Sequence, residues 1–387
     1  MPISQNSGRN LAFLPDLPEK DWQRAQQALN ARNKARAADD ERIRRQYEGI
    51  IEEAARRRHD LIGAKAVRDL HRFLQVEQQA LTAKLQPPGG LKLDRDKAFA
   101  QRRRRVDTFV KSLGIAPGKL REIGQAATAA AQALQADRFA GEVAGFHLRD
   151  NLAKWQALSP FNALGHAFDL EPMEGWELVT PPFFGFLWRN WRFTGLDFVV
   201  STDFEVDPPA GMVGASITMS VPDLGQYDMG EAYQEAMIAF AYRPAESGLV
   251  EVLIEAQNAV GIHDLKTENC FGVSDSSTVQ SNALFVEVLD PNVPENRAAV
   301  MSEFKKDTDD DNRWTFSSLT VGASFFAQLI STRPVAANRT AIVLVGTRTY
   351  WWSKVDDVKV SGTPNFRWFI RSVQIHIAPG TPQPPIA

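Results

Sequence analysis

The sequence predicts a multidomain α+β chain, in which an N-terminal antiparallel α-helical bundle is followed by a C-terminal antiparallel β-sandwich or jelly roll. Three observations predict it. Apolar residues recur at three- and four-residue steps in the first 150 residues and at two-residue steps after residue 176. Eight of the nine tryptophans follow residue 150. The first 150 residues hold 28 Lys+Arg against 19 Asp+Glu, a net charge of +9, whereas the remaining residues hold 16 against 28, a net charge of -12.

Composition and charge change at the same place, and this indicates a domain boundary. Ser159-Pro160 and Glu171-Pro172 interrupt regular structure there. The predicted segments are an N-terminal extension (1–18), an α-helical bundle (19–158), a linker (159–175), a β-sandwich (176–378) and an extended Pro-rich tail (379–387). We expect limited proteolysis to release a β-rich fragment of a little over 200 residues, within the usual size of a domain, about 50 to 250 residues.

The first predicted helix is long, covering about 19–86, and is broken once at most. Gly49 and Gly63 are its weak points, because glycine costs about 1 kcal/mol relative to alanine inside a helix. Two consecutive prolines after residue 86 end it.

Three shorter helices complete the predicted bundle. One begins after Asp94, a favourable N-cap, and ends before Gly114. The next opens at Pro117, and its alanine-rich surface would let a neighbouring helix approach closely. A fourth is expected over about 137–158. Short connections between such helices favour an antiparallel arrangement.

Eight strands are predicted from the two-residue alternation, and turns rich in Asp, Pro, Gly and Ser separate them. They cover residues 193–200, 215–221, 237–242, 249–256, 283–289, 317–330, 340–349 and 366–377. No helical pattern alternates with these strands, which disfavours a parallel doubly wound sheet. An antiparallel two-sheet sandwich of about 200 residues is therefore expected.

The predicted binding site surrounds two adjacent tryptophans. Consecutive side chains of a strand point to opposite faces, so Trp351 and Trp352 cannot both enter one core. We expect one indole to be exposed, or else buried by a partner or by the helical part. An exposed ring could stack on a sugar or anchor a protein interface, and the alternative is packing at the junction between domains. The predicted ligand- or partner-binding residues are Tyr350, Trp351, Trp352, Lys354, Asp356 and Asp357.

An acidic run offers one metal site. Asp307, Asp309 and Asp311 place carboxylates at alternate positions, as calcium loops do. The match is incomplete, because Asn312 stands where such a loop needs glycine and Ser318 stands where it needs glutamate. An exposed acidic loop between strands explains the same residues. Calcium is the only cofactor that the sequence suggests.

No catalytic residue is predicted. The sequence contains no nucleophile elbow, phosphate-binding loop, dinucleotide fingerprint or zinc-protease motif. Cys270 follows His263 by seven residues, but a lone cysteine is more often a small buried hydrophobe. Glycosidase carboxylates carry no short signature, so an enzyme stays open as an alternative. The acidic candidates for that chemistry are Asp197, Asp203, Glu205, Glu251 and Glu255.

Two arginine clusters, at residues 56–58 and 102–105, could contact the phosphates of nucleic acid or anionic lipid. Acidic residues precede both clusters along the chain, which favours salt bridges on a solvated helix face. Nucleic-acid binding is therefore disfavoured, although the clusters leave it open. The single cysteine excludes an intramolecular disulfide. No uninterrupted apolar stretch reaches the roughly 18 residues of a membrane span, and with no signal peptide apparent we expect synthesis in the cytoplasm.

These features favour a non-enzymatic structural or attachment protein. Its helical part would dock or self-assemble, and its β-sandwich would bind a protein or glycan partner, as in a viral or phage-like shell or appendage. The opposite charges of the two parts are expected to meet within one chain or between copies. One alternative is a toxin-like protein with membrane-active helices and a receptor-binding sandwich. Another is a carbohydrate-active enzyme or lectin.

Overall fold

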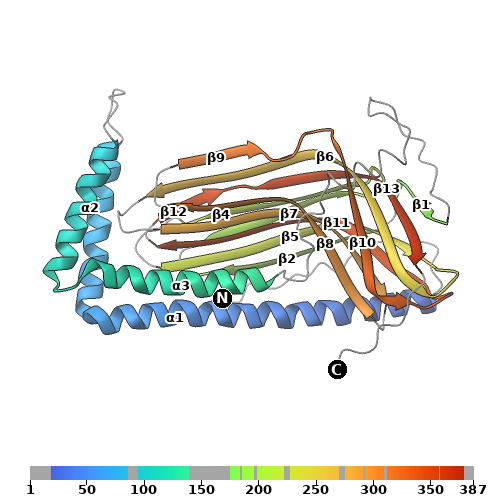
Figure 1. The fold of residues 1–387 in the computed structure, drawn as a ribbon, viewed down its shortest axis with the longest axis horizontal. Coiled ribbons are helices and arrows are strands. Elements are labelled where there is room, and N and C mark those ends of the chain that lie inside the picture. Colours follow the sequence, from blue (N-terminus) through green and yellow to red (C-terminus); the bar gives the residue numbers. More distant parts are fainter. Residues whose placement is uncertain are drawn as a thin grey trace.

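A computed structural model describes residues 19–85, 95–138, 175–183, 185–195, 198–221, 227–269, 275–290, 293–308, 312–356 and 358–378. This part of the chain has one long N-terminal helix, two shorter helices and a mostly antiparallel β-sheet region (Figure 1).

The helices follow the sequence pattern closely. They are α1 (Glu19–Leu85), α2 (Arg95–Ser112) and α3 (Pro117–Arg138). The expected break in the long helix occurs at Gly63, which adopts φ 77° and ψ 154°. Gly114 follows α2 with φ 78°, a left-handed conformation that glycine reaches without strain. The predicted fourth helix lies almost wholly outside the described residues.

Two antiparallel sheets make up the rest of the described chain. The five-stranded sheet has the order β2-β5-β11-β7-β8, and the eight-stranded sheet has the main order β1-β13-β4-β12-β6-β10, with β3 on β4 and β9 on β6. The strands of the first are β2 (Gly185–Thr194), β5 (Tyr227–Tyr242), β7 (Asp275–Asp290), β8 (Val293–Thr308) and β11 (Ala341–Asp356). The strands of the second are β1 (Glu177–Val179), β3 (Val199–Asp207), β4 (Met212–Ser220), β6 (Gly248–Asn269), β9 (Asn312–Ser317), β10 (Ser324–Val335), β12 (Val358–Gly362) and β13 (Asn365–Ala378).

The main apolar core lies between the sheets. Val343 and Val345 of β11 share it with Val252 and Ile254 of β6 and with Trp368 of β13. Because side chains alternate along a strand, the intervening residues of β11 face away from this core. The outer face of the five-stranded sheet is therefore also apolar in part, and it needs a cover.

Helices α1 and α3 provide that cover, as they lie along the five-stranded sheet (Figure 1). Ala28 and Leu29 of α1 share a buried cluster with Met237 of β5. Further along, Ile43 and Tyr47 of α1 share another with strand residues. The helices thus pack on the sheet as well as on one another, and the predicted self-contained bundle is not confirmed. The jelly-roll topology is also not confirmed, and the division of the chain near residues 159–175 stays a prediction.

Beyond Gly63 the chain leaves the sheet. Figure 1 shows the end of α1 and all of α2 standing at a steep angle to the docked part of α1. Their apolar contacts are with each other and with the start of α3; Phe73 stacks on Phe109 with ring centroids 4.2 Å apart. We call the pair formed by residues 64–85 and 95–112 the helical hairpin.

Candidate functional site

The two adjacent tryptophans face opposite sides of β11, as the alternation predicts. Trp351 lies in the cluster between the sheets and donates its indole N–H to Ser353 Oγ at 2.7 Å. Trp352 lies on the outer face, in the cluster that includes Tyr47 of α1 and Ala127 of α3. Both side chains are 0% exposed. The expectation of an exposed indole is wrong, and the helical part buries Trp352, as the stated alternative had it.

The other predicted binding residues offer no open surface either. Tyr350 is buried in the same cluster as Trp352. Lys354 is also fully buried, with its ammonium 5.4 Å from the ring centroid of Tyr227. The side chain of Asp356 and all of Asp357 lie outside the described residues. Tyr350 and Trp352 therefore lie at an internal interface between the helices and the five-stranded sheet, whereas Trp351 lies between the two sheets.

Only one of the three predicted calcium ligands lies within the described residues. Asp307 is exposed near the end of β8, and Asp309 and Asp311 lie outside the described residues. Within the described ranges, no three His, Cys, Asp or Glu side chains are grouped so that they could hold a metal ion. Calcium binding by this acidic run stays a prediction.

The candidate catalytic groups that the structure describes lie on β3 and β6. Cys270 and Asp197 lie outside the described residues. His263 is buried, with Nε2 2.7 Å from Ser302 Oγ, and burial lowers its pKa to about 4. The four remaining carboxylates lie on two strands, Asp203 and Glu205 on β3 and Glu251 and Glu255 on β6.

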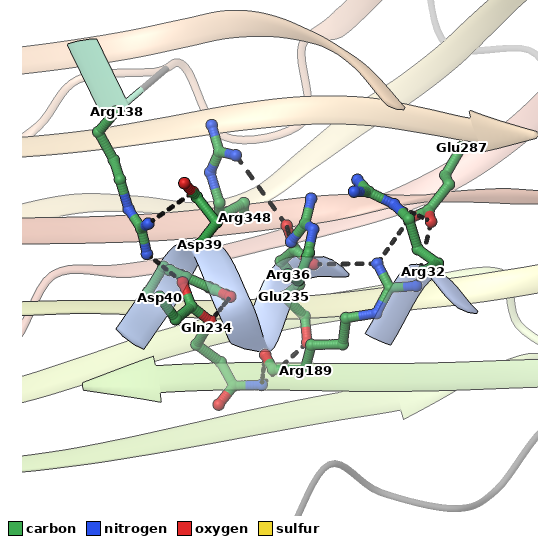
Figure 2. Close-up of polar contacts among 11 residues, drawn as sticks. Arg32, Arg36, Asp39, Asp40, Arg138, Arg189, Gln234, Glu235, Glu287 and Arg348 are labelled. Carbon is green, nitrogen blue, oxygen red and sulfur yellow. Dashed lines mark hydrogen bonds and ion pairs between the residues drawn. The ribbon is translucent and has the colours of Figure 1, made fainter. Parts of the chain in front are cut away.

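A buried layer of charges joins the helices to the five-stranded sheet (Figure 2). Arg32, Arg36 and Asp40 follow one another at four-residue steps, so they share one face of α1. Glu231 and Glu235 lie on the outer face of β5. The layer also contains Arg138 of α3, Arg189 of β2, Glu287 of β7 and Arg348 of β11, and the exposed Asp39 of α1 lies at its edge.

Glu287 holds one end of this layer. Arg189 Nη1 lies 2.5 Å from Glu287 Oε2, and Arg32 Nε lies 2.8 Å from Oε1. Burial alone would raise the pKa of Glu287, but Arg189, Arg32 and Arg36 lower it to about 2. The carboxylate is therefore ionised across the physiological range and bridges α1 to two strands.

Glu235 occupies the middle. Arg36 Nη1 donates to Glu235 Oε1 at 2.8 Å, and Arg189 Nη1 lies 3.5 Å from Oε2. Arg348 Nη1 lies 4.0 Å from Oε1. Burial opposes ionisation, but Arg36, Arg189 and Arg348 outweigh it and lower the pKa of Glu235. This carboxylate thus neutralises cations from a helix and two strands.

Arg138, the last residue of α3, closes the other end. It pairs with Asp40, and its Nη1 lies 3.2 Å from Asp39 Oδ2 while its Nε lies 3.2 Å from Glu231 Oε1. Its guanidinium also lies over the ring of Trp191, 4.5 Å from the centroid. Arg138 therefore fastens α3 to both α1 and the sheet.

Glu231 differs from the other two glutamates. Burial raises its pKa to about 6, which Arg138 and Tyr47 only partly offset. A raised carboxyl pKa favours the folded state fully below the pKa of the unfolded chain. That contribution is lost as pH rises through about 6. Glu231 therefore weakens the folded state at neutral pH relative to mildly acidic pH.

These contacts confirm that the opposite charges of the two parts meet within the chain. Arg32, Arg36 and Arg138 come from the basic N-terminal part, and their partners Glu231, Glu235 and Glu287 come from the acidic part. Buried ion pairs add little net stability, because desolvation offsets much of their attraction. Their directional bonds do fix how the helix lies on the strands.

The helical hairpin presents a different charge pattern. Its two segments hold eleven Lys and Arg against four Asp and Glu, a net charge of +7. Lys65, Arg68 and Arg72 are exposed and form no ion pair within the described residues. Their spacing places them on one side of α1 together with Val76, whose side chain is 57% exposed. We call these four residues the basic stripe.

The two arginine clusters behave mainly as predicted. Arg56 and Arg57 pair with Glu53 at 2.5 and 2.6 Å, and Arg105 pairs with Glu77 at 2.7 Å. Arg104 is exposed. Most of these described guanidinium groups are therefore engaged on the helix surface, which favours a salt-bridged face over a phosphate-binding patch.

An aromatic group opens to solvent where β8 and β9 border the two sheets. Phe316 is 40% exposed, and its ring centroid lies 5.3 Å from that of Phe304 and 5.5 Å from that of His263. Trp314 lies two residues earlier, on the same face of β9, with the ammonium of Lys306 5.1 Å from its ring centroid. We call Phe304, Trp314 and Phe316 the aromatic edge. The sequence pattern does not predict the aromatic edge, because the predicted strand begins only at residue 317, where β9 ends.

A groove runs between α1 and α3. It has a volume of about 450 Å³. Its lining residues on α1 are Gln46, Gly49, Ile50, Glu53, Ala54 and Arg57, and those on α3 are Ile123, Ala126, Ala127, Ala130 and Leu134. The groove is therefore apolar in its floor and charged at one rim.

None of the helices in the described chain is both long and apolar enough to cross a membrane.

Comparison with known proteins yields only distant likenesses. No family model and no curated protein matches the chain. Among solved structures, the enzymatically active domain of tailspike protein 4 from bacteriophage CBA120 is 13% identical, with a TM-score of 0.16 over 49% of this chain and 18% of that one. Carbohydrate-binding modules of families 35 and 11 from Clostridium thermocellum are 10% and 9% identical. They cover 49% and 54% of this chain and 98% of their own, with TM-scores of 0.15 and 0.18. At these scores the likenesses carry no argument about function.

Proposed function

We propose that this chain is a non-enzymatic structural or attachment protein, in which the helical hairpin docks onto an acidic surface of another copy. The observation that carries the proposal is the contrast between the two halves of α1. The first half is fixed to the sheet by buried ion pairs, and the second half projects (Figure 1) with the basic stripe, whose cations form no ion pair with any described residue.

The partner follows from the chemistry of the stripe. Three cations on one side of a helix, which have no ion-pair partner among the described residues, attract a surface of opposite charge. Residues 151–387 of every copy carry a net charge of -12. The exposed Val76 at the end of the stripe gains more from an apolar contact with protein than from a phosphate backbone. These two features support a protein partner over nucleic acid.

Light scattering at low and high salt tests the proposal. We expect assemblies larger than the high-salt form at low salt, because contacts between exposed charges are screened over about 8 Å at physiological ionic strength. Arg68→Gln with Arg72→Gln should remove this salt-dependent growth. Lys20→Gln with Lys34→Gln, which changes two exposed cations on the docked half of α1, should leave it intact.

Two results would contradict this proposal. One is an assembly size that does not change with salt. The other is a double hairpin variant that assembles as the wild type does. A short DNA duplex that binds at low salt and is lost in the same double variant would instead assign the stripe to nucleic acid.

The aromatic edge gives the sandwich a surface for a glycan, as a second candidate function. Phe316 is held by Phe304 and His263 while a large part of its ring stays exposed, so little entropy would be lost on stacking. Lys306 supplies a donor beside the neighbouring Trp314. Binding on a glycan array that Phe316→Ala removes would support this role, and no binding by the wild type would discard it.

A further inference from the structure

We propose that two copies of this chain pack their α3 helices antiparallel across the α1–α3 groove, around a two-fold axis. This contact is separate from the hairpin contact proposed above. It assigns an occupant, a second copy, to the groove and to the exposed side of α3 beside it.

The exposed side of α3 is apolar and flat. Ala126, Ala129, Ala130 and Ala133 are all exposed, and Ala126 and Ala130 also line the groove. A helix surface made of alanines lets another helix approach closely, nearer than the usual 8 to 10 Å. Charged and long polar side chains usually cover an exposed helix face. On this side of α3 the exposed residues between Glu122 and Asp137 are alanines, and the exposed Gln125 and Gln132 lie on the neighbouring side.

The two ends of α3 carry opposite charges, so two antiparallel copies of the helix bring unlike charges together. Lys119 and Asp137 are 18 residues apart, which is about five helical turns, so both lie on the same side as Ala126 and Ala130. Both are exposed, and neither forms an ion pair within the described chain. When the two helices cross antiparallel at the level of Thr128 along the helix axis, Lys119 lies beside the partner's Asp137. Ala126 then lies beside the partner's Ala130. A two-fold axis repeats each contact.

Gly49 of α1 supplies an independent observation. It lies inside a helix, where glycine costs about 1 kcal/mol relative to alanine. A Cβ built at this position meets no atom within 4 Å, so no contact with the described residues requires glycine there. Gly49 lines the groove, and its missing side chain leaves room for the second copy.

Sedimentation over a range of concentrations tests the proposal in the Arg68→Gln/Arg72→Gln background, where the hairpin contact is removed. The failure of either proposal then leaves the other one testable. We expect a dimer. Ala130→Arg should raise its Kd by about 100-fold or more, because it places a long charged side chain in the close helix contact. Ala130 is exposed, so circular dichroism and thermal unfolding should stay those of the background.

Charge reversal tests the orientation. Lys119→Glu alone and Asp137→Lys alone should each raise the dimer Kd by about tenfold, and the two changes together should restore it. Lys34→Glu, an exposed control on α1 away from the groove, should have little effect. A monomer at every concentration, a dimer that Ala130→Arg leaves intact, or a double reversal that does not restore association would overturn the proposal.

Discussion

Glu287→Ala is expected to lower the free energy of unfolding by about 3 to 5 kcal/mol, because it leaves buried arginines without their carboxylate. Arg189 and Arg32 both donate to Glu287, and all three side chains are buried or largely so. Denaturant unfolding at neutral pH measures the change. Glu53→Ala is the matched control, since its pairs with Arg56 and Arg57 are exposed and such pairs contribute little to stability.

The pH dependence of this effect has a defined sign. Glu287 has a lowered pKa of about 2 in the folded chain, so its contribution is present above the pKa of an unfolded glutamate and is lost as pH falls toward 2. The difference between wild type and Glu287→Ala should therefore shrink on acidification. Equal stability of the two proteins at neutral pH would show that the charged layer does not hold α1 on the sheet.

Trp352→Ala and Trp351→Ala are each expected to cost about 3 to 5 kcal/mol of stability, the usual range for truncating a buried tryptophan. Trp351 fills the space between the sheets, whereas Trp352 fills the space between sheet and helices. Loss of Trp352 should therefore also weaken the seating of α1 and α3. Thermal and denaturant unfolding of the purified variants measure both effects.

Trp314→Ala serves as the control for the tryptophan series. Its ring is only partly buried at the aromatic edge, so its removal should lower stability less than removal of Trp351 or Trp352. Two results together would contradict the structure. These are near-wild-type stability of Trp352→Ala, and quenching of the Trp352 fluorescence of the wild type by a soluble agent, which would show that the indole is exposed.

Much of the helical part could be predicted from local signals. Gly63, Gly114 and Pro117 each act within their own turn of chain, so their effects do not depend on tertiary contacts. The opposite orientation of Trp351 and Trp352 likewise follows from the pleat of one strand. The order of these elements was therefore predictable, together with several of their ends.

The opposite charges of the two parts were expected to meet, but the individual charged contacts that place α1 on the sheet could not be predicted. Arg32, Arg36 and Asp40 read as an ordinary solvated helix face, and only the facing Glu235 and Glu287 give them a buried role. One available signal was the pair of carboxylates, Glu231 and Glu235, that lie four residues apart within the otherwise largely apolar strand β5. The strand β8 was missed for a related reason, since its polar residues mask the two-residue alternation.

The contacts described above make the first half of α1 part of one cooperative unit with the five-stranded sheet. Native-state hydrogen exchange followed by mass spectrometry measures this cooperativity. We expect amides within residues 25–54 to exchange with the same opening free energy as those of β5 and β11, and Glu287→Ala to lower both together. Exchange of residues 25–54 through a much smaller opening, while β5 and β11 stay protected, would contradict the account.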